Sequence, residues 1–325
     1  MPSPRFDRSA LHIQPLEKRR HDLGLESILP LKELNADSVH PKLQQIAKRM
    51  VRARIEGRAN VIMIGAHVIR SGVQNYLIDL MKRGYLNCLA MNGAGIIHDY
   101  EFASIGATTE SVARYIKTGE FGLWRETGVL NDIINTAYRK DDSIGMGEAV
   151  GQNILDEKLP HAETSLFAWA CKLQIPATVH VGIGYDIIHE HPNCNGAATG
   201  ALSYNDFLKF AAVIQNLEGG AVMNFGSSVM APEVYLKALS MARNVASQNG
   251  AVIKNFATLV CDLHDLPENF DREPSREDPA YFFRPWKTML VRTVSDGGES
   301  FYVKGRHADT IPALWTAINH AETNR

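Results

Sequence analysis

One lysine in the segment FFRPWKTMLVR, residues 282–292, has the neighbours that amine chemistry requires. Lys287 directly follows Trp286 and precedes a run of strand-forming residues. An amine shielded from water beside an indole has a lowered pKa, so it can attack a carbonyl or imine carbon. The indole face can also hold a cationic substrate. The alternative is a lysine that packs its stem on the ring and keeps its charge in water.

Two aspartates each follow an apolar run that contains glycine. Asp99 ends the segment NGAGIIHD, and Asp186 ends HVGIGYD. If both lie in one cleft, this acidic pair suits a cationic ligand such as an amine, by charge and by hydrogen bonding. The alternative, two exposed aspartates without a function, stays open.

Polar or glycine-containing segments follow five apolar runs. In sheets of parallel strands, ligands bind beyond the carboxyl ends of the strands. Glycine there can expose backbone N–H groups to a phosphate, although a tight turn also needs glycine for its own geometry. We therefore predict a ligand site built from strand-end segments. The five are GAHVIRSG (65–72), MNGAGIIHD (91–99), HVGIGYD (180–186), NFGSSVMAPE (224–233) and CDLHD (261–265).

Standard nucleotide, hydrolase and zinc motifs are absent from the sequence. The glycine pair Gly93 and Gly95 begins a dinucleotide fingerprint, but His98 stands where its third glycine belongs. There is no P-loop, and FGSSVM is not a serine nucleophile elbow. The residues from His180 to Cys194 include three histidines, but their spacing matches no structural zinc finger. We predict no metal, with a catalytic zinc site in this segment as the alternative.

The bulk composition excludes several classes of protein. The 325 residues are 45% hydrophobic and 22% charged, with a formal net charge of -2, so the chain lacks the basic footprint of a nucleic-acid binder. Four scattered cysteines argue against a disulfide scaffold. No apolar run is long enough for a signal peptide core or a membrane span. We expect a cytoplasmic protein with neither nucleic-acid nor membrane partners.

From residue 38 onward, the spacing of apolar residues alternates between helices and short strands. This alternation predicts an α/β fold, a Rossmann-like parallel sheet with helices on both faces. An Asp-Gly-Gly turn between the two halves of 287–305 predicts a C-terminal hairpin, followed by a helix. We therefore expect an N-terminal arm, 1–37, and one domain, 38–325. The predicted helices are 38–57, 71–84, 108–119, 163–174, 203–219, 232–246 and 309–322, and the strands are 59–67, 86–95, 176–184, 220–228 and 257–263.

The order of several segments resembles the deoxyhypusine synthase family, in a divergent bacterial form. The resemblance runs from about Asn60 to the C-terminus and is carried by GAHVIRSG, NGAGIIHDYE, IPATVHVGIGYD, GAVMNFGSSV and PWKT. Members of that family are homotetramers with an NAD-binding Rossmann-like core. NAD takes a hydride from spermidine beside its secondary amine, the aminobutyl group passes to an active-site lysine, and a target amine then receives it.

The resemblance implies roles for individual residues. Lys287 would be the catalytic nucleophile, and Asp186, Trp286, Glu233 and Asp99 would bind the polyamine. The cofactor-binding residues would be Gly65, His67, Ser71, Asn92, Gly93, Gly95, Gly182, Gly226, Ser227 and Ser228.

The match to the family is partial. Val181 stands where the family has a cofactor-binding aspartate, Ile97 where it has a glutamate, and Glu233 where it has a substrate-binding histidine. The acceptor is either a small amine, as in homospermidine synthesis, or a protein lysine. Two further hypotheses stay open: a metal-dependent enzyme on the same scaffold, and a non-catalytic ligand-binding relative.

Overall fold

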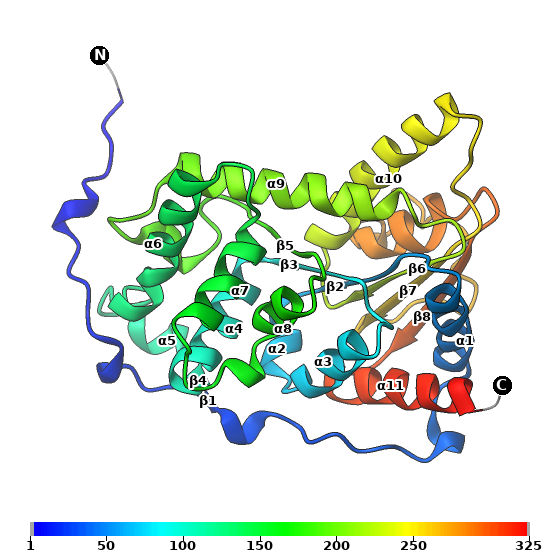
Figure 1. Cartoon of the computed structure of the whole chain (residues 1–325), viewed down its shortest axis with the longest axis horizontal. Coiled ribbons are helices and arrows are strands. Elements are labelled where there is room, and N and C mark those ends of the chain that lie inside the picture. The colour runs from blue at the N-terminus through cyan, green and yellow to red at the C-terminus, as the bar shows by residue number, and fades with distance from the viewer. Residues whose placement is uncertain (1–2, 324–325) are drawn as a thin grey trace.

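A sheet of six parallel strands forms the centre of the molecule (Figure 1). The structure is a computed structural model that describes residues 3–323. The strands lie in the order β5-β3-β2-β6-β7-β8, which is the order of a doubly wound dinucleotide-binding sheet. The predicted fold class is therefore confirmed. The strands are β2 (Asn60–Ile64), β3 (Cys88–Asn92), β5 (Ala177–His180), β6 (Ala221–Phe225), β7 (Ala257–Asp262) and β8 (Glu299–Lys304).

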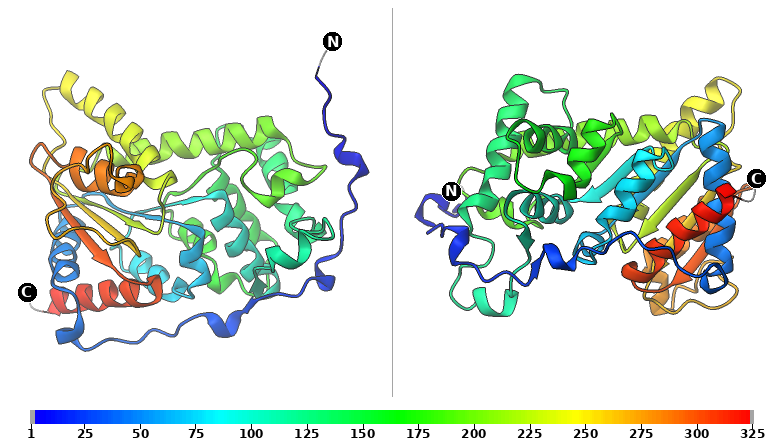
Figure 2. Two further views of the ribbon diagram at one scale, coloured as in Figure 1. Left: turned by 180° about the vertical axis from the view of Figure 1, so that it is seen from behind. Right: turned by 60° about the horizontal axis from the view of Figure 1, so that its bottom comes forward.

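The inner strands β2 and β6 bury both of their faces, because helices cover the two sides of the sheet (Figure 2), whereas the edge strand β8 is partly exposed. In β2, Ile62 and Ile64 pack on one side, while Val61 and Met63 pack on the other, as the two-residue period of a strand requires. The first side is covered by α1 (Pro41–Ile55), α3 (Gln74–Lys82) and α11 (His307–Thr323). The second is covered by α9 (Gly196–Ile214) and α10 (Met230–Gln248).

A block of helices separates β3 from β5 in the sequence and lies beside the sheet (Figure 1). Its first member, α4 (Gly93–Ile105), starts where the Asn92 side chain accepts a hydrogen bond from the Gly95 N–H and stops at Gly106, whose φ of 66° favours glycine. Of this block, the sequence predicted only α5 and α8. Its other helices are α5 (Val112–Tyr115), α6 (Arg125–Lys140), α7 (Met146–Asp156) and α8 (Leu166–Lys172).

The N-terminal arm runs along the outside of the molecule, past the helical block and on to α11 (Figures 1 and 2). It pairs through β1 (Leu23–Gly24) with β4 (Ala107–Thr108), in an antiparallel bridge of two residues. Leu34 N–H donates to the Thr316 hydroxyl of α11. Short turns of 3-10 helix punctuate the chain: η1 (Arg8–Ala10), η2 (Leu16–Lys18), η3 (Leu25–Ser27), η4 (Ala36–Ser38), η5 (Ala162–Thr164), η6 (Ile187–Glu190) and η7 (Pro279–Phe282).

The predicted C-terminal hairpin is wrong. The residues Pro285–Arg292 form a π-helix, η8, that packs on β7, β8 and α10, while β8 pairs in parallel with β7. A proline at the first position suits a helix start. The strand-like apolar run is buried because η8 lies on the sheet, so its composition did not distinguish a helix from a strand. The C-terminal helix is confirmed as α11.

No helix within residues 3–323 combines the length and the apolar character that a membrane span needs.

The close contact between Gly65, after β2, and Gly226, after β6, can be tested by substitution. A Cβ on Gly65 would lie 2.4 Å from the Gly226 carbonyl oxygen, so Gly65→Ala forces the two backbones apart. We expect a loss of about 1–3 kcal/mol of unfolding free energy, measured by urea denaturation. Gly200→Ala is the matched control, because nothing lies within 4 Å of its added Cβ in the helix α9. It should gain roughly 0.5–1 kcal/mol. Equal midpoints for Gly65→Ala and the unsubstituted protein would contradict the argument.

Candidate functional site

The strand order reverses direction between β2 and β6, and the turns after these two strands form the centre of the site. The chain moves from β2 to β3 and β5 on one side, and from β6 to β7 and β8 on the other. Gly226 has a φ of 67°, which favours glycine, and its carbonyl faces Gly65 at close range. These two glycines are required for packing as well as being available to a ligand.

A cavity of about 590 Å³ opens at this switch point. Four strands contribute to it through the segments that follow β2, β3, β5 and β6. This is where ligands bind in doubly wound sheets, and the volume lies within the range of ordinary ligand pockets. The lining residues are Gly65, Ala66, His67, Asn92, Gly93, Ala94, His180, Val181, Gly182, Tyr185, Asp186, Gly226, Ser227, Ser228, Val229, Met230 and Val234.

Asp186 is the buried carboxylate of this cavity, with 7% of its surface exposed. Its backbone N–H donates to His189 Nδ1, which holds the loop, and its carboxylate accepts a hydrogen bond from the Ala94 N–H at the start of α4. The second oxygen, Oδ2, is buried without a hydrogen-bond partner among the described residues. Burial raises the pKa of Asp186 to about 6, and the Ala94 hydrogen bond opposes that rise.

Glycine at position 93 lets this carboxylate reach the helix. A Cβ on Gly93 would lie 2.0 Å from Asp186 Oδ2, so any other residue would push the carboxylate away. The positive end of the α4 dipole therefore faces Asp186. The Asp186 carboxylate therefore already occupies the N-terminus of α4.

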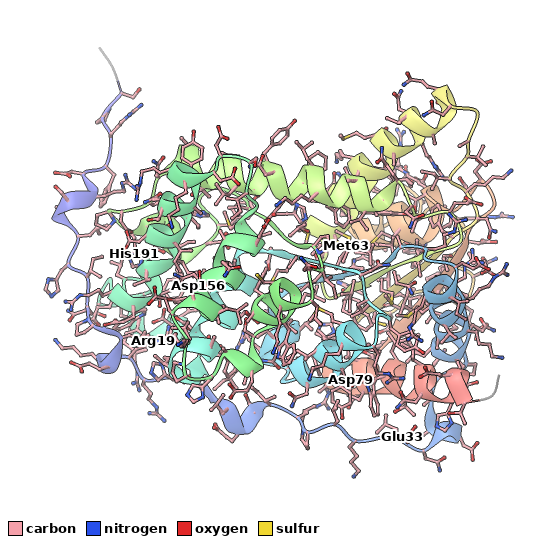
Figure 3. The ribbon with its side chains drawn as sticks, viewed as in Figure 1. Arg19, Glu33, Met63, Asp79, Asp156 and His191 are labelled. Atoms are coloured by element: carbon pink, nitrogen blue, oxygen red, sulfur yellow. The ribbon has the colours of Figure 1, made fainter. Side chains whose placement is uncertain are left out.

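Asp186 also borders a second cavity, of about 300 Å³, next to the first. Its wall contains a buried ion pair: Arg19 of the arm donates to both oxygens of Glu101, at 2.7 and 2.9 Å (Figure 3 labels Arg19). The hydroxyls of Thr108 and Thr127 also donate to Glu101. Burial alone would raise the pKa of Glu101, but these bonds and the Arg19 charge hold it below its usual value.

Most of the predicted cofactor-binding residues line the first cavity. The exceptions are Ser71, whose hydroxyl donates to the His67 carbonyl at the end of α2 (Ala66–Arg70), and Gly95, which packs against Met91. The structure brings together Gly65, His67, Asn92, Gly93, Gly182, Gly226, Ser227 and Ser228.

The predicted acidic pair does not form, because Asp99 lies inside α4 rather than at a strand end. Its oxygens accept hydrogen bonds from the Ser165 hydroxyl at 2.5 Å and the Leu166 N–H at 2.7 Å, at the start of α8. Only 1% of Asp99 is exposed, and it does not line the cavity. The glycine-rich segment continues as a helix, which turned Asp99 away from the cleft.

The predicted substrate residues of the C-terminal region lie outside both cavities. Trp286 packs in the core and donates its indole N–H to the Phe270 carbonyl at 3.0 Å. Lys287 is 3% exposed, and its Nζ lies 3.4 Å from the centroid of the Tyr281 ring. Glu233, in the first turn of α10, is held in ion pairs with Arg284, at 2.7 Å, and with Lys237.

The histidines of the segment 180–194 make hydrogen bonds within the protein. His191 Nε2 lies 2.8 Å from the Gly122 carbonyl, and His180 Nε2 lies 3.0 Å from the Thr178 hydroxyl. Within the described part of the chain, no three His, Cys, Asp or Glu side chains are placed to hold an ion together.

Sequence reasoning missed the residues that shape the second cavity. Arg70 lies in the segment 65–72, where Gly65, His67 and Ser71 were assigned a role but Arg70 was not. Arg19, Thr109 and Glu110 stand in no motif, and Glu101 ends the segment NGAGIIHDYE without an assigned role. A buried ion pair that joins residues 82 positions apart leaves no local pattern in the sequence.

Comparisons with known proteins support the fold and no more. No protein-family model and no curated protein matches the chain. A LOR/SDH protein from Methanococcus maripaludis superposes with a TM-score of 0.50 at 17% identity, over 91% of this chain and 74% of that protein. AgrE with L-arginine superposes with a TM-score of 0.50 at 16% identity, over 86% of this chain. The chain matches only 33% of AgrE, about a third of its length.

A structure of a candidate deoxyhypusine synthase from Entamoeba histolytica is also similar. Its TM-score is 0.39 at 11% identity, over 85% of this chain and 87% of that one. Such a distant likeness carries no argument about family or reaction. The chain has a Rossmann-like α/β fold with a cavity at its switch point, and a fold of this kind does not by itself define a function.

We predict that the buried ion pair between Arg19 and Glu101 holds the N-terminal arm on the helical block. Arg19→Met leaves a buried carboxylate without its counter-charge, so we expect a loss of about 3–5 kcal/mol of unfolding free energy and faster proteolysis of the arm. The neighbouring Arg20 is exposed, so Arg20→Met should leave both measurements unchanged. If the two variants unfold alike, the buried pair does not hold the arm.

Proposed function

We propose that the protein is an NAD-dependent enzyme that oxidises an amine substrate at the switch-point cavity. The observation that carries the proposal is the Asp186 carboxylate, which is buried at the junction of two cavities with Oδ2 unpartnered among the described residues. Leaving a buried carboxylate oxygen without a partner costs free energy, and a cationic ligand would recover it. Asp186 is also the substrate contact that the family resemblance implies.

The residues of the first cavity fit NAD in a nonstandard way. After β2, the segment continues Gly65-Ala66-His67-Val68-Ile69-Arg70, so a dinucleotide fingerprint keeps only its first glycine. Asn92 ends β3, where such sheets carry an acidic residue for the ribose. The backbone at Gly65 and the turn Gly226–Ser228 line the cavity where the diphosphate would lie. The Asn92 side-chain oxygen already accepts from the Gly95 N–H, so its NH2 group would donate to a ribose hydroxyl.

The chain's own residues would position the amine and take its proton. When bound, NAD accepts a hydride from the carbon that carries the nitrogen. Asp186 holds the ammonium group, and its raised pKa suits a carboxylate that accepts a proton as the C=N bond forms. Tyr185 lines both cavities, so it lies where cofactor and substrate would meet.

The pH dependence of amine binding follows from Asp186. The carboxylate is ionised above its pKa of about 6 and neutral below it, so affinity for a cationic amine should fall as the pH drops. We expect a decrease of about tenfold between pH 8 and pH 5, measured by calorimetry with spermidine and a panel of primary amines at saturating NAD. Asp186→Asn should weaken binding at pH 8 by about 10- to 100-fold and remove the dependence on pH.

The control is Glu190→Gln, because Glu190 is exposed, lies on the same loop and lines neither cavity. It should bind amines as the unsubstituted protein does. If NAD itself does not bind, the enzyme proposal fails and the ligand-binding hypothesis is favoured. If Asp186→Asn keeps its amine affinity at pH 8, the role of Asp186 is wrong.

Aminobutyl transfer through Lys287 is the finer form of this proposal, taken from the family resemblance. It is supported by the burial of the amine, by the irregular π-helix that carries it and by its proximity to Glu233, whose pKa the Lys287 charge helps to lower after the larger effect of the Lys237 hydrogen bond. Lys287 would have to leave the Tyr281 ring to reach a substrate in the cavity.

Borohydride reduction tests the transfer step. With NAD and spermidine present, reduction should fix an aminobutyl adduct on Lys287, located by peptide mapping. Lys287→Ala should abolish the adduct, whereas the control Lys237→Ala, at an exposed lysine paired with Glu233, should retain it. If no adduct forms while NAD is still reduced, the protein oxidises amines without transfer. The predicted homotetramer is checked in the same preparation by light scattering.

A further inference from the structure

The second cavity has an unusual set of unused polar atoms. It lies directly beside the cofactor cavity and shares Ala94, Tyr185 and Asp186 with it. Three buried side-chain atoms on its lining residues have no hydrogen-bond partner within residues 3–323: Arg70 Nε, Thr109 Oγ1 and Asp186 Oδ2. Buried polar atoms are almost always paired in native proteins, so three at one cavity indicate a polar ligand.

The other charged groups of the cavity are already paired. Arg19 and Glu101 neutralise one another. The oxygens of Glu110 accept hydrogen bonds from the Gly122 N–H at 3.0 Å and from the Trp124 indole at 2.7 Å. The groups left for a ligand are therefore one guanidinium and one carboxylate.

Arg70 is the cationic one of these two groups. It ends α2, and one of its terminal nitrogens lies 3.1 Å from His67 Nε2. Burial and the Arg70 charge lower the pKa of His67. An imidazole carries no negative charge in any protonation state, so His67 gives Arg70 no counter-charge. The planar guanidinium is suited to a carboxylate, which accepts two parallel hydrogen bonds from it.

Backbone strain at Thr109 supports a built site. Its φ of 68° is unfavourable for a β-branched residue, and its hydroxyl lies at the cavity without a hydrogen-bond partner among the described residues. Strain of this kind is retained where surrounding structure enforces it, most often at ligand sites. Here the neighbouring Thr108 is bonded to Glu101, and the Asp22 N–H of the arm donates to the Thr109 carbonyl at 2.9 Å.

We propose that the second cavity binds an amino acid, with its carboxylate on Arg70 and its amine on Asp186. The inference rests on the proposed function, since it names the substrate class of the same site. The cavity walls are largely apolar, through Ile97, Val112, Phe121 and Ile187, and receive the side chain.

A polyamine fits the same groups less well. It carries positive charges only, so it would pair with Asp186 but leave Arg70 without a partner and place like charges in one small cavity. An amino acid satisfies both groups, and its carboxylate is what distinguishes it from a simple amine.

The contribution of the ligand's carboxylate to binding can be tested with pairs of ligands that differ only in that group. Calorimetry at saturating NAD would compare each of the twenty standard L-amino acids, then set the best binder against the amine that lacks its carboxylate, for example L-lysine against cadaverine. We expect the amino acid to bind about tenfold or more tightly than its amine. Arg70→Met should remove that preference while the amine affinity is retained, and Arg70→Lys should restore part of it.

The matched control is Arg114→Met, because Arg114 is exposed on α5 and lines neither cavity. This variant should keep the preference for the amino acid over its amine. Thermal unfolding of all variants checks that each one folds. Equal affinity of the unsubstituted protein for amine and amino acid, tighter binding of spermidine, or an unchanged preference in Arg70→Met overturns the proposal. If the amino acid binds without NAD and NAD does not bind, the enzyme proposal fails while the amino-acid site stands.

Discussion

The site depends on one steric constraint, the contact between the turns that follow β2 and β6. The backbone at Gly65 meets the Gly226 carbonyl without room for a side chain. Because β2, β3, β5 and β6 run parallel, the segments after β3 and β5 reach the same edge of the sheet. A wider separation of β2 and β6 would disturb the parallel ladder between them and the crevice above it.

The second feature on which the site depends is the buried carboxylate of Asp186, of which Oδ2 has no hydrogen-bond partner among the described residues. Asp186 lies in the loop after β5, and its carboxylate accepts a hydrogen bond from the Ala94 N–H in the first turn of α4. Asp186 lines both cavities. Burying such a group without a ligand costs free energy, which a fold tolerates at a place where a ligand recovers it. We therefore place the proposed reaction at the junction of the two cavities.

The N-terminal arm is part of the second cavity rather than an appendage. Arg19 enters from the arm and pairs with Glu101 of α4, while the antiparallel bridge of β1 with β4 holds the segment that leads to Thr109 and Glu110. With Arg19 paired inside the protein, Arg70 is the cation left to a ligand. The arm thus influences which charges the cavity presents, although it lies far from the sheet in the sequence.

The sequence by itself determined that apolar strands alternate with helices, because apolar periodicity is local and the inner strands are buried on both faces. It also located the strand-end glycine segments, since parallel strands bring their carboxyl ends to one edge. It did not reveal α4, α6 and α7. Tertiary structure alone decided the rest. The run 285–292 became a helix because it packs on the sheet, and Asp99 turned inward because α4 begins at Gly93. The pairing of Arg19 with Glu101 and the isolation of Arg70 and Asp186 depend on contacts between distant segments, which no local pattern encodes.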